Sequence, residues 1–389
     1  MKIIFIQWES YGTQDILNIY RSIGHNIIML PFNRLNCRRD DEFEQALTKC
    51  IQLHLPDYIF SFNYFPVVSQ TCNKIGIPYV AWVYDSPYVL LYSYTTLNAC
   101  NHIYVFDREL CREFNQAGIH TVKYLPMAAN TSRLDACLLS NIPDEVIPLL
   151  PHSNITFIGS MYTEKHQFYE RLTGITEYTK GYLEAIMNAQ QKVYGYNFIQ
   201  ELLTPDIIED LYRILPMKPN RDGVESREYL YSEYVINRNI TRMERFNLLS
   251  SIGKLHSLDV YTPDIALNSY GITRHAPIDY YDHVPYIIKR SKINLNITLR
   301  SIKSGIPLRA FDIMGAGGFL LTNYQSDFLD HFVPGEDFVY FDSEADMLTK
   351  IAYYLNHEEE RKTIAKNGYN KVTRHHTYLH RIYEWEADL

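Results

Sequence analysis

Short apolar runs alternate with amphipathic stretches through residue 125, and this alternation predicts the fold class. The apolar runs lie at residues 2–8, 27–30, 58–62, 79–84, 103–106 and 122–125. Helical spacing appears between them at about residues 15–23, 43–53 and 108–117, and further helices are expected after Pro66 and Pro87. Strands that are apolar throughout are typical of a parallel sheet covered on both faces. One helix per strand therefore predicts a doubly wound α/β domain.

The second part of the chain repeats this organisation after an irregular segment. Residues 126–151 turn polar and contain several prolines, which indicates an interdomain linker. We expect an N-terminal Rossmann-like domain at residues 1–140 and a second one at 150–370, followed by a last helical segment at 371–389. Residues 173–251 have a mostly helical pattern, so we predict a helical insertion in the second domain.

Residues 293–322 carry the most specific pattern in the chain. An apolar strand is followed by a loop with glycine and proline, a helix that starts at Leu308 with Arg309 and Asp312 in its first turns, and a second strand. Such a unit places a helix N-terminus at the carboxyl end of a parallel sheet, where open α/β sheets bind phosphorylated ligands. The alternative is that Arg309 and Asp312, three residues apart, form an intrahelical ion pair worth a few tenths of a kcal/mol.

The segment R-A-F-D-I-M-G-A-G-G-F-L-L-T resembles the R-x-F-E/D-x-x-x-x-G motif of the CgeB-type (spore maturation protein) glycosyltransferases, within the wider group of GT-B glycosyltransferases. The resemblance covers most of the chain and is most specific between Ile293 and Asn370. It implies two Rossmann-like domains facing across a cleft, with a nucleotide-sugar donor on the second domain and the acceptor on the first. It also implies that the last helix packs back on the N-terminal domain.

The same resemblance implies roles for residues of the motif. Asp312 is expected to bind the ribose of the donor, and the helix start around Leu308 and Arg309 is expected to face the diphosphate. Arg309 would then offset the negative charge on the leaving group. Retaining GT-B enzymes often carry a second glutamate eight positions before the acidic residue; here that position is Ser304. The paired-glutamate pattern of a retaining mechanism is therefore absent.

Further donor-binding candidates follow two other strands of the second domain. Gly159 ends an apolar strand, and the polar loop after it contains Lys165, a strand–glycine–cation arrangement that suits a phosphate. Thr298 and Arg300 follow the strand that contains Asn294 and Asn296. These four polar residues are equally consistent with ligand contact and with stabilisation of the loop, because buried asparagines must find hydrogen-bond partners.

Asp85 is the catalytic candidate of the first domain. It lies in W-V-Y-D-S-P at the carboxyl end of an expected strand, and W-x-x-D-S-P resembles a recurring segment of the CgeB-type family. If the reaction inverts, a base must deprotonate the acceptor hydroxyl, and Asp85 is our candidate. The alternative is a helix N-cap, a common role for aspartate.

Several classes of site are disfavoured by the sequence. There is no D-x-D motif, which agrees with a metal-independent reaction that needs no cofactor. His375, His376 and His380 have no further ligands nearby in the sequence, so we interpret them as structural. The net charge of −8 without a basic stripe disfavours nucleic acid as a partner.

The location expected from the sequence is cytoplasmic. Six scattered cysteines without a C-x-x-C pair favour reduced thiols. The sequence shows no transmembrane segment and no cleavage region of a signal peptide after Met1.

The sequence therefore predicts a GT-B glycosyltransferase of the hexosyltransferase type. It would move a sugar from a nucleotide-diphosphate sugar, expected to be UDP-linked, to a hydroxyl of a glycan or protein acceptor. The resemblance implies a bacterial cell-surface, spore or protein-glycosylation pathway. Two alternatives remain open: a sugar-nucleotide epimerase on the same architecture, and a non-catalytic protein that binds nucleotide sugars.

Overall fold

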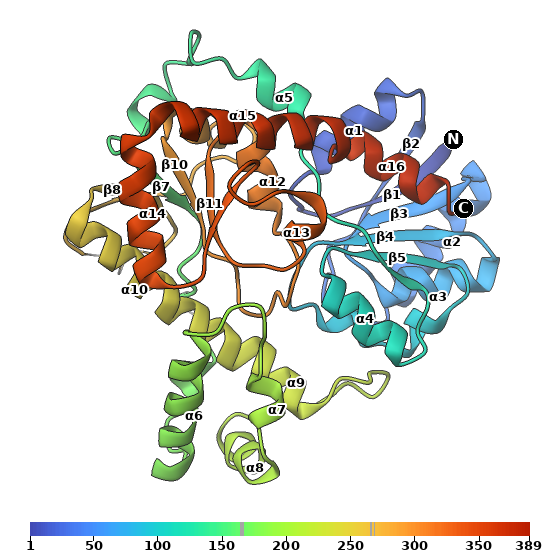
Figure 1. The fold of residues 1–389 in the computed structure, drawn as a ribbon. Helices are drawn as coiled ribbons and strands as arrows, with labels where there is room; N and C mark the ends of the chain where they lie inside the picture. Colours follow the sequence, from blue (N-terminus) through green and yellow to red (C-terminus); the bar gives the residue numbers. More distant parts are fainter. Residues whose placement is uncertain (164–166, 265–266, 268) are drawn as a thin grey trace. The chain divides into compact units, whose positions relative to one another are not determined.

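The computed structural model describes residues 1–163, 167–264, 267 and 269–389. They form two compact units. Unit 1 consists of Met1–Ala128, Pro219–Glu225 and His376–Leu389; unit 2 consists of Ala129–Lys218 and Ser226–His375. Each unit contains a parallel sheet with helices packed against it (Figure 1). The expected fold class, two Rossmann-like α/β domains, is confirmed.

The sheet of unit 1 has the order β2-β1-β3-β4-β5-β6, and its pairings are parallel. Its strands are β1 (Lys2–Gln7), β2 (Asn26–Pro31), β3 (Tyr58–Phe62), β4 (Tyr79–Val83), β5 (Asn101–Val105) and β6 (Val122–Tyr124). Its helices are α1 (Thr13–Ser22), α2 (Asp41–His54), α3 (Pro66–Ile75), α4 (Arg108–Gln116) and α16 (Tyr378–Glu386). Every residue of β3 and β4 is buried, which explains why these strands are apolar runs.

Local signals position most helices of unit 1. Asp40 caps α2 by accepting a hydrogen bond from the Phe43 N–H, and Asp107 caps α4 in the same way. The helix expected after Pro87 is absent as an α-helix: that segment forms two 3₁₀ turns, η1 (Val89–Leu91) and η2 (Tyr94–Leu97). Hydrogen bonds to the loop backbone, such as Tyr94 N–H to the Asp222 carbonyl, hold it in that form.

The C-terminal helix α16 is part of the core of unit 1. The Trp385 ring lies 5.3 Å from the Phe60 ring and 5.6 Å from the Trp82 ring, centroid to centroid. The buried Arg381 donates from Nε to the Pro126 carbonyl at 2.8 Å. Helix α16 also packs against α1. The last residues of the chain therefore complete the hydrophobic core of the unit that contains its first residues.

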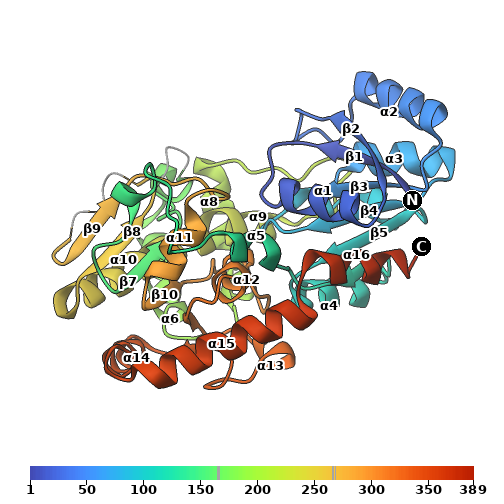
Figure 2. The same cartoon turned by 90° about the horizontal axis from the view of Figure 1, so that it is seen from above.

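The sheet of unit 2 has the order β12-β11-β10-β7-β8-β9, again with parallel pairings. Its strands are β7 (Ile155–Ile158), β8 (Leu258–Tyr261), β9 (Ile272–His275), β10 (Ile293–Asn296), β11 (Leu320–Asn323) and β12 (Val339–Phe341). The helices packed around it are α5 (Thr131–Ala136), α11 (Val284–Arg290), α12 (Leu308–Gly315), α13 (Phe328–His331), α14 (Glu344–Asn356) and α15 (Glu358–His375), with turns η3 (Ile147–Leu149) and η4 (Tyr169–Arg171). Helix α15 lies alongside α12 (Figure 2).

The expected helical insertion is present between β7 and β8. It comprises α6 (Glu177–Gln190), α7 (Ile199–Leu202), α8 (Pro205–Ile214), α9 (Arg227–Tyr231), the π-helical turn η5 (Ser232–Ile236) and α10 (Asn237–Leu255). Its helices share an apolar core of their own that includes Leu183, Leu211 and Ile240. Within the insertion, residues 219–225 belong to unit 1.

Gly368 lies inside α15, which continues to His375. A Cβ at this position would lie 2.4 Å from the Asp337 carbonyl oxygen, so the glycine allows a close approach between helix and loop. Helix α11 starts at Val284. In the described ranges, no helix combines the length and the apolar character that a membrane span requires.

Candidate functional site

Unit 2 has a topological switch point between β7 and β10. These strands are neighbours, but the chain continues from β7 towards β8 on one side and from β10 towards β11 on the other. In open parallel sheets this divergence leaves a crevice at the carboxyl ends of the two strands. Gly159 directly follows β7, and Thr298 lies two residues after β10. The sheet order therefore places these two candidates at the same edge.

Arg309 lies at this switch point. Its Nη1 donates a hydrogen bond to Asn296 Oδ1 at 3.2 Å, and its guanidinium lies 5.6 Å from the centre of the Phe157 ring. A Cβ at Gly159 would lie 2.7 Å from Arg309 Nη2. A cation is thus held against the ends of β7 and β10. The structure brings together Gly159 and Arg309, which the sequence placed 150 positions apart.

The start of α12 adds backbone donors beside this cation. Pro307 is the N-cap residue, and it makes no side-chain cap. The first N–H groups of an α-helix have no acceptor four residues earlier in the helix, and that of Ala310 donates to the Pro307 carbonyl at 2.9 Å. They also form the positive end of the helix dipole, and this end favours anions. Arg309 and the α12 start together form a positively polarised edge.

Asp312 lies one turn further along α12 and is 4% exposed. The Tyr280 hydroxyl donates to both carboxylate oxygens, at 3.0 Å to Oδ1 and 3.1 Å to Oδ2. The Arg133 guanidinium lies 5.3 Å from the centre of the Tyr280 ring. Asp312 is therefore a buried acceptor whose orientation is fixed by a tyrosine from a different segment. Tyr280 is not among the site residues predicted from the sequence.

Thr298 is fixed by asparagines on both sides. Asn296 donates from Nδ2 to Thr298 Oγ1 at 3.0 Å and to Thr322 Oγ1 at 2.9 Å. The Thr298 N–H donates to Asn323 Oδ1 at 2.7 Å. Asn294 accepts from Thr156 and donates to the Ile288 carbonyl. The buried asparagines thus have the hydrogen-bond partners that their burial requires.

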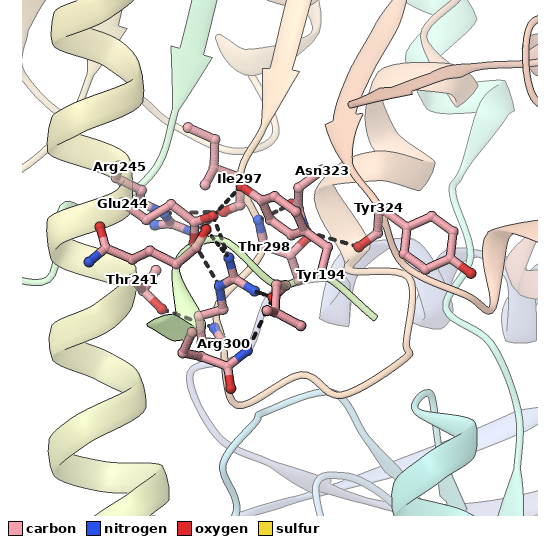
Figure 3. A network of polar contacts seen from close by, with 12 residues as sticks. Tyr194, Thr241, Glu244, Arg245, Ile297, Thr298, Arg300, Asn323 and Tyr324 are labelled. Atoms are coloured by element: carbon pink, nitrogen blue, oxygen red, sulfur yellow. Dashed lines mark hydrogen bonds and ion pairs between the residues drawn. The ribbon is translucent and has the colours of Figure 1, made fainter. Parts of the chain in front are cut away.

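Arg300 forms a buried ion pair with Glu244 of α10 (Figure 3). Nε and Nη2 donate to the two carboxylate oxygens at 2.9 and 2.7 Å, and Nη1 donates to the Val193 carbonyl at 2.8 Å. The Tyr194 ring covers the guanidinium at 4.3 Å, and its hydroxyl donates to Glu244. Burial, with a further contribution from Glu244, raises the pKa of Tyr194 well above its ordinary value. These contacts match the loop-stabilising alternative for Arg300.

Arg245, the residue next to Glu244, links the two strands of the switch point (Figure 3). It is 2% exposed and donates to the Ile297 carbonyl after β10, from Nε at 3.1 Å, and to the Ser160 carbonyl after β7. Glu244 and Arg245 are not among the site residues predicted from the sequence. They lie in a stretch whose apolar spacing already accounts for a helix, and charged residues between such positions are ordinary. No sequence signal distinguishes them.

Unit 1 contains the carboxylate candidate at the carboxyl end of β4. Asp85 accepts a hydrogen bond from Asn63 Nδ2 at 2.6 Å, while Asn63 Oδ1 accepts from the N–H groups of Tyr84 and Asp85. Burial raises the pKa of Asp85, and the bond from Asn63 partly opposes the rise. The cap position of the following turn is Tyr88, so Asp85 is not the N-cap of a helix. Trp8 stacks on Tyr84 at 6.1 Å between ring centroids, which places an aromatic surface beside this edge.

Lys165 lies outside the described residues. The remaining candidates are divided between the two units: Gly159, Thr298, Arg300, Arg309 and Asp312 belong to unit 2, and Asp85 belongs to unit 1.

A family model described as "Glycosyl transferase-like" matches residues 236–387, which include Arg309 and Asp312. No curated protein matches the sequence. Among solved structures, the trehalose-6-phosphate synthase OtsA has a TM-score of 0.57 at 10% identity, covering 100% of this chain and 98% of its own. A glycosyltransferase from Rickettsia africae has a TM-score of 0.53 at 10% identity, with 98% and 97% covered.

HepE from Anabaena, solved in complex with UDP-glucose, has a TM-score of 0.52 at 10% identity, with both chains fully covered. At these identities the similarity concerns the fold. The protein therefore has the two-domain GT-B fold of glycosyltransferases, with a glycosyl transferase-like segment in its second half.

Proposed function

We propose that this protein is a glycosyltransferase that transfers a sugar from a nucleoside-diphosphate sugar to a hydroxyl group. The observation that carries the proposal is the position of Arg309. It lies against Gly159 at the switch point of a parallel sheet, beside the uncapped start of α12. A fixed cation and the positive end of a helix dipole at this edge suit a diphosphate, whose charge grows as the sugar leaves.

The roles of the other residues follow from their contacts. Asp312, oriented by Tyr280, would accept hydrogen bonds from ribose hydroxyls. Thr298 would line the same edge, and Lys165 would add a second cation. We assign Arg300 to positioning, because its guanidinium donors bind Glu244 and backbone carbonyls. Asp85 would deprotonate the acceptor hydroxyl, since its raised pKa makes it a stronger base than an exposed carboxylate.

We propose a UDP-linked donor, because the similar HepE structure holds UDP-glucose. The sequence has no D-x-D motif, and Arg309 and the helix dipole can supply the positive charge. We therefore propose that the transfer does not need a metal ion. The CgeB-type motif further suggests a hexosyl group and a glycan or protein acceptor of a bacterial surface or spore pathway, with the enzyme in the cytoplasm.

Thermal-shift measurements against nucleoside diphosphates and nucleotide sugars test the proposal. A ligand that binds only the folded state raises the melting temperature by mass action. At a concentration 100 times its dissociation constant, it adds about 2.7 kcal/mol to the free energy of unfolding. We expect UDP and a UDP-sugar to raise it in the wild type and much less in Arg309→Met. No shift with any nucleotide would contradict the proposal.

A transfer assay separates the enzyme classes. A transferase releases UDP in proportion to the glycosylated acceptor, whereas an epimerase converts its nucleotide sugar without an acceptor. A binding protein would show the thermal shift and no turnover.

A further inference from the structure

A cavity of about 410 Å³ lies at the edge of unit 2 opposite the switch point. Its walls come from the end of α11, the turn at residues 316–319 that leads into β11, and one face of α15. These segments meet at the amino ends of β10 and β11, whereas Gly159 and Thr298 lie at the carboxyl ends of β7 and β10. The cavity therefore shares no residue with the proposed donor site.

Arg361 of α15 lines this cavity and is 7% exposed. Its Nη1 donates to the Lys292 carbonyl at 3.0 Å, and its buried Nε has no hydrogen-bond partner among the described residues. The nearest carboxylate, Glu358, lies 4.0 Å from Nη2 and is in closer contact, at 2.7 Å, with Lys362. A buried N–H of a charged group without an acceptor is costly. An anion in the cavity would lie beside this guanidinium group and offset its burial electrostatically.

Lys289, in the last turn of α11, contributes a second cation to the lining. Its Nζ donates to the carbonyls of Leu134 and Cys137, at 2.6 and 2.8 Å. These acceptors fix the ammonium group but carry no charge. Burial lowers the pKa of Lys289, although Cys137 and Asp135 partly offset this shift. Burial also lowers the pKa of Arg361, and Glu358 partly offsets that shift. An anion close to both side chains would therefore stabilise their charged forms.

The mouth of the cavity is also basic. Lys362 and Lys366 of α15 line it, and both are exposed. Two carboxylates are close by and already engaged: Glu358 with Lys362, and Asp135 with the Tyr369 hydroxyl at 2.8 Å. The lining thus carries four cations, and the two acids nearby are not part of it. Its volume falls in the usual range for small-molecule sites.

We propose that this cavity binds the phosphate group of a small molecule, held by Arg361 and Lys289 and attracted by Lys366. A phosphate suits the site because its charge can be shared between the guanidinium group of Arg361 and an ammonium group. The chemistry is shared by inorganic phosphate and by phosphorylated metabolites such as sugar phosphates, and the volume leaves room for the latter.

The test uses the full chain in a buffer free of phosphate and sulfate, with binding measured by isothermal titration calorimetry. Inorganic phosphate, glucose 6-phosphate and glucose are titrated into the wild type and three variants: Arg361→Gln, Lys366→Ala and Lys180→Ala. Lys180 is an exposed lysine of α6 and serves as the matched control. We expect both phosphates to bind the wild type and Lys180→Ala, glucose to bind neither, and Lys366→Ala to bind phosphate about tenfold more weakly.

Arg361→Gln should lose phosphate binding; if it does not fold, Lys366→Ala decides alone. Tighter binding of glucose 6-phosphate than of phosphate would identify a phosphorylated metabolite as the occupant, and equal binding would identify phosphate itself. Arg309→Met should bind phosphate like the wild type, which separates this site from the proposed donor site. The absence of phosphate binding, or equal affinities in Lys366→Ala and Lys180→Ala, would overturn the proposal.

Discussion

The guanidinium group of Arg309 occupies the space that a side chain at Gly159 would need. A Cβ at Gly159 would lie 2.7 Å from Nη2 and 3.2 Å from the central carbon of the guanidinium group. The glycine after β7 therefore does more than end a strand: it admits a cation from α12 to the carboxyl edge of the sheet. The proposed function depends on this contact, because it fixes the charge where a diphosphate would bind.

Gly159→Ala is predicted to weaken nucleotide binding and also to reduce stability, because the φ of Gly159 is +159°, a conformation that residues with a side chain rarely adopt. The added methyl group meets the end of a flexible side chain, which can move away, but Arg309 then leaves its position. Loss of one charged hydrogen bond corresponds to about 1.5–3 kcal/mol, or at least a tenfold rise in the dissociation constant of UDP. Calorimetry on the variant measures this change.

Gly181→Ala is the matched control for that substitution. Gly181 lies inside α6, and a Cβ there meets no atom within 4 Å. Alanine should stabilise the helix by about 0.5–1 kcal/mol and leave UDP binding unchanged. Equal UDP affinity in Gly159→Ala and in the control would show that Arg309 does not need its observed position.

Breaking the Arg300–Glu244 pair is predicted to destabilise the fold. Both side chains are buried, so Glu244→Gln or Arg300→Met leaves a charge without its partner and costs about 3–5 kcal/mol. Urea unfolding measures this, and the double variant should lose much less than the sum of the single losses. Arg112→Met, which breaks an exposed pair with Glu109, should cost less than about 1 kcal/mol.

The same variants distinguish the two roles considered for Arg300. If it only supports the loop, Arg300→Met and Glu244→Gln should change the KM for the donor to the same extent. A much larger change in Arg300→Met alone would show that Arg300 contacts the donor.

Tyr280→Phe is predicted to reduce both stability and donor affinity. The substitution removes the hydroxyl that donates to both oxygens of Asp312 and leaves a buried carboxylate with one donor fewer. Hydrogen bonds to charged groups contribute about 1.5–3 kcal/mol. Thermal unfolding and the KM for the UDP-sugar measure the two effects. Tyr270→Phe, at an 82% exposed tyrosine, should change neither. An unchanged KM in Tyr280→Phe would argue against a role of Asp312 in binding ribose.

Asp85→Asn is predicted to stabilise the protein at neutral pH. Burial raises the pKa of Asp85 in the folded state. At pH values between the pKa of this carboxyl group in the unfolded state and its pKa in the folded state, the protein therefore takes up a proton when it folds. Stability therefore falls as the pH rises through the folded pKa, and the uncharged amide avoids this loss. Melting temperatures of variant and wild type should converge as the pH is lowered to about 3.9, the ordinary value for aspartate.

The catalytic assignment of Asp85 predicts the opposite effect on activity. A general base acts only when ionised, so sugar transfer should decline as the pH falls through the pKa of Asp85. Asp85→Asn should lower kcat by about 10²–10⁴-fold. Transfer at the wild-type rate in this variant would remove Asp85 as the base while leaving the proposal for Arg309 intact.

The parts of the fold that follow from local pattern were predicted well. Strand β3 covers the predicted residues Tyr58–Phe62 and is buried throughout. Helix α12 and its glycine-rich end follow from the motif itself. In these segments, burial on both faces or capping within a few residues determines the structure, so neighbouring residues contain the information.

The remaining features depend on residues far apart in the sequence. Arg245 binds the carbonyl of Ser160, Gly368 is required by the carbonyl of Asp337, and the loop at residues 219–225 joins unit 1 through the buried pair of Glu225 with Arg38. Each residue has an ordinary local interpretation: a helix-surface charge, a C-cap or a polar loop. Periodicity and capping rules cannot reveal such contacts, since they consider one segment at a time.

The most direct test of the central claim is the preference of the protein for UDP over UMP, compared between the wild type and Arg309→Gln by calorimetry. If Arg309 and the α12 start bind the diphosphate, the wild type should bind UDP at least tenfold more tightly than UMP. Most of that preference should disappear in the variant, while the affinity for UMP changes little. A preference of the same size in both proteins would show that the diphosphate binds elsewhere and would contradict the account.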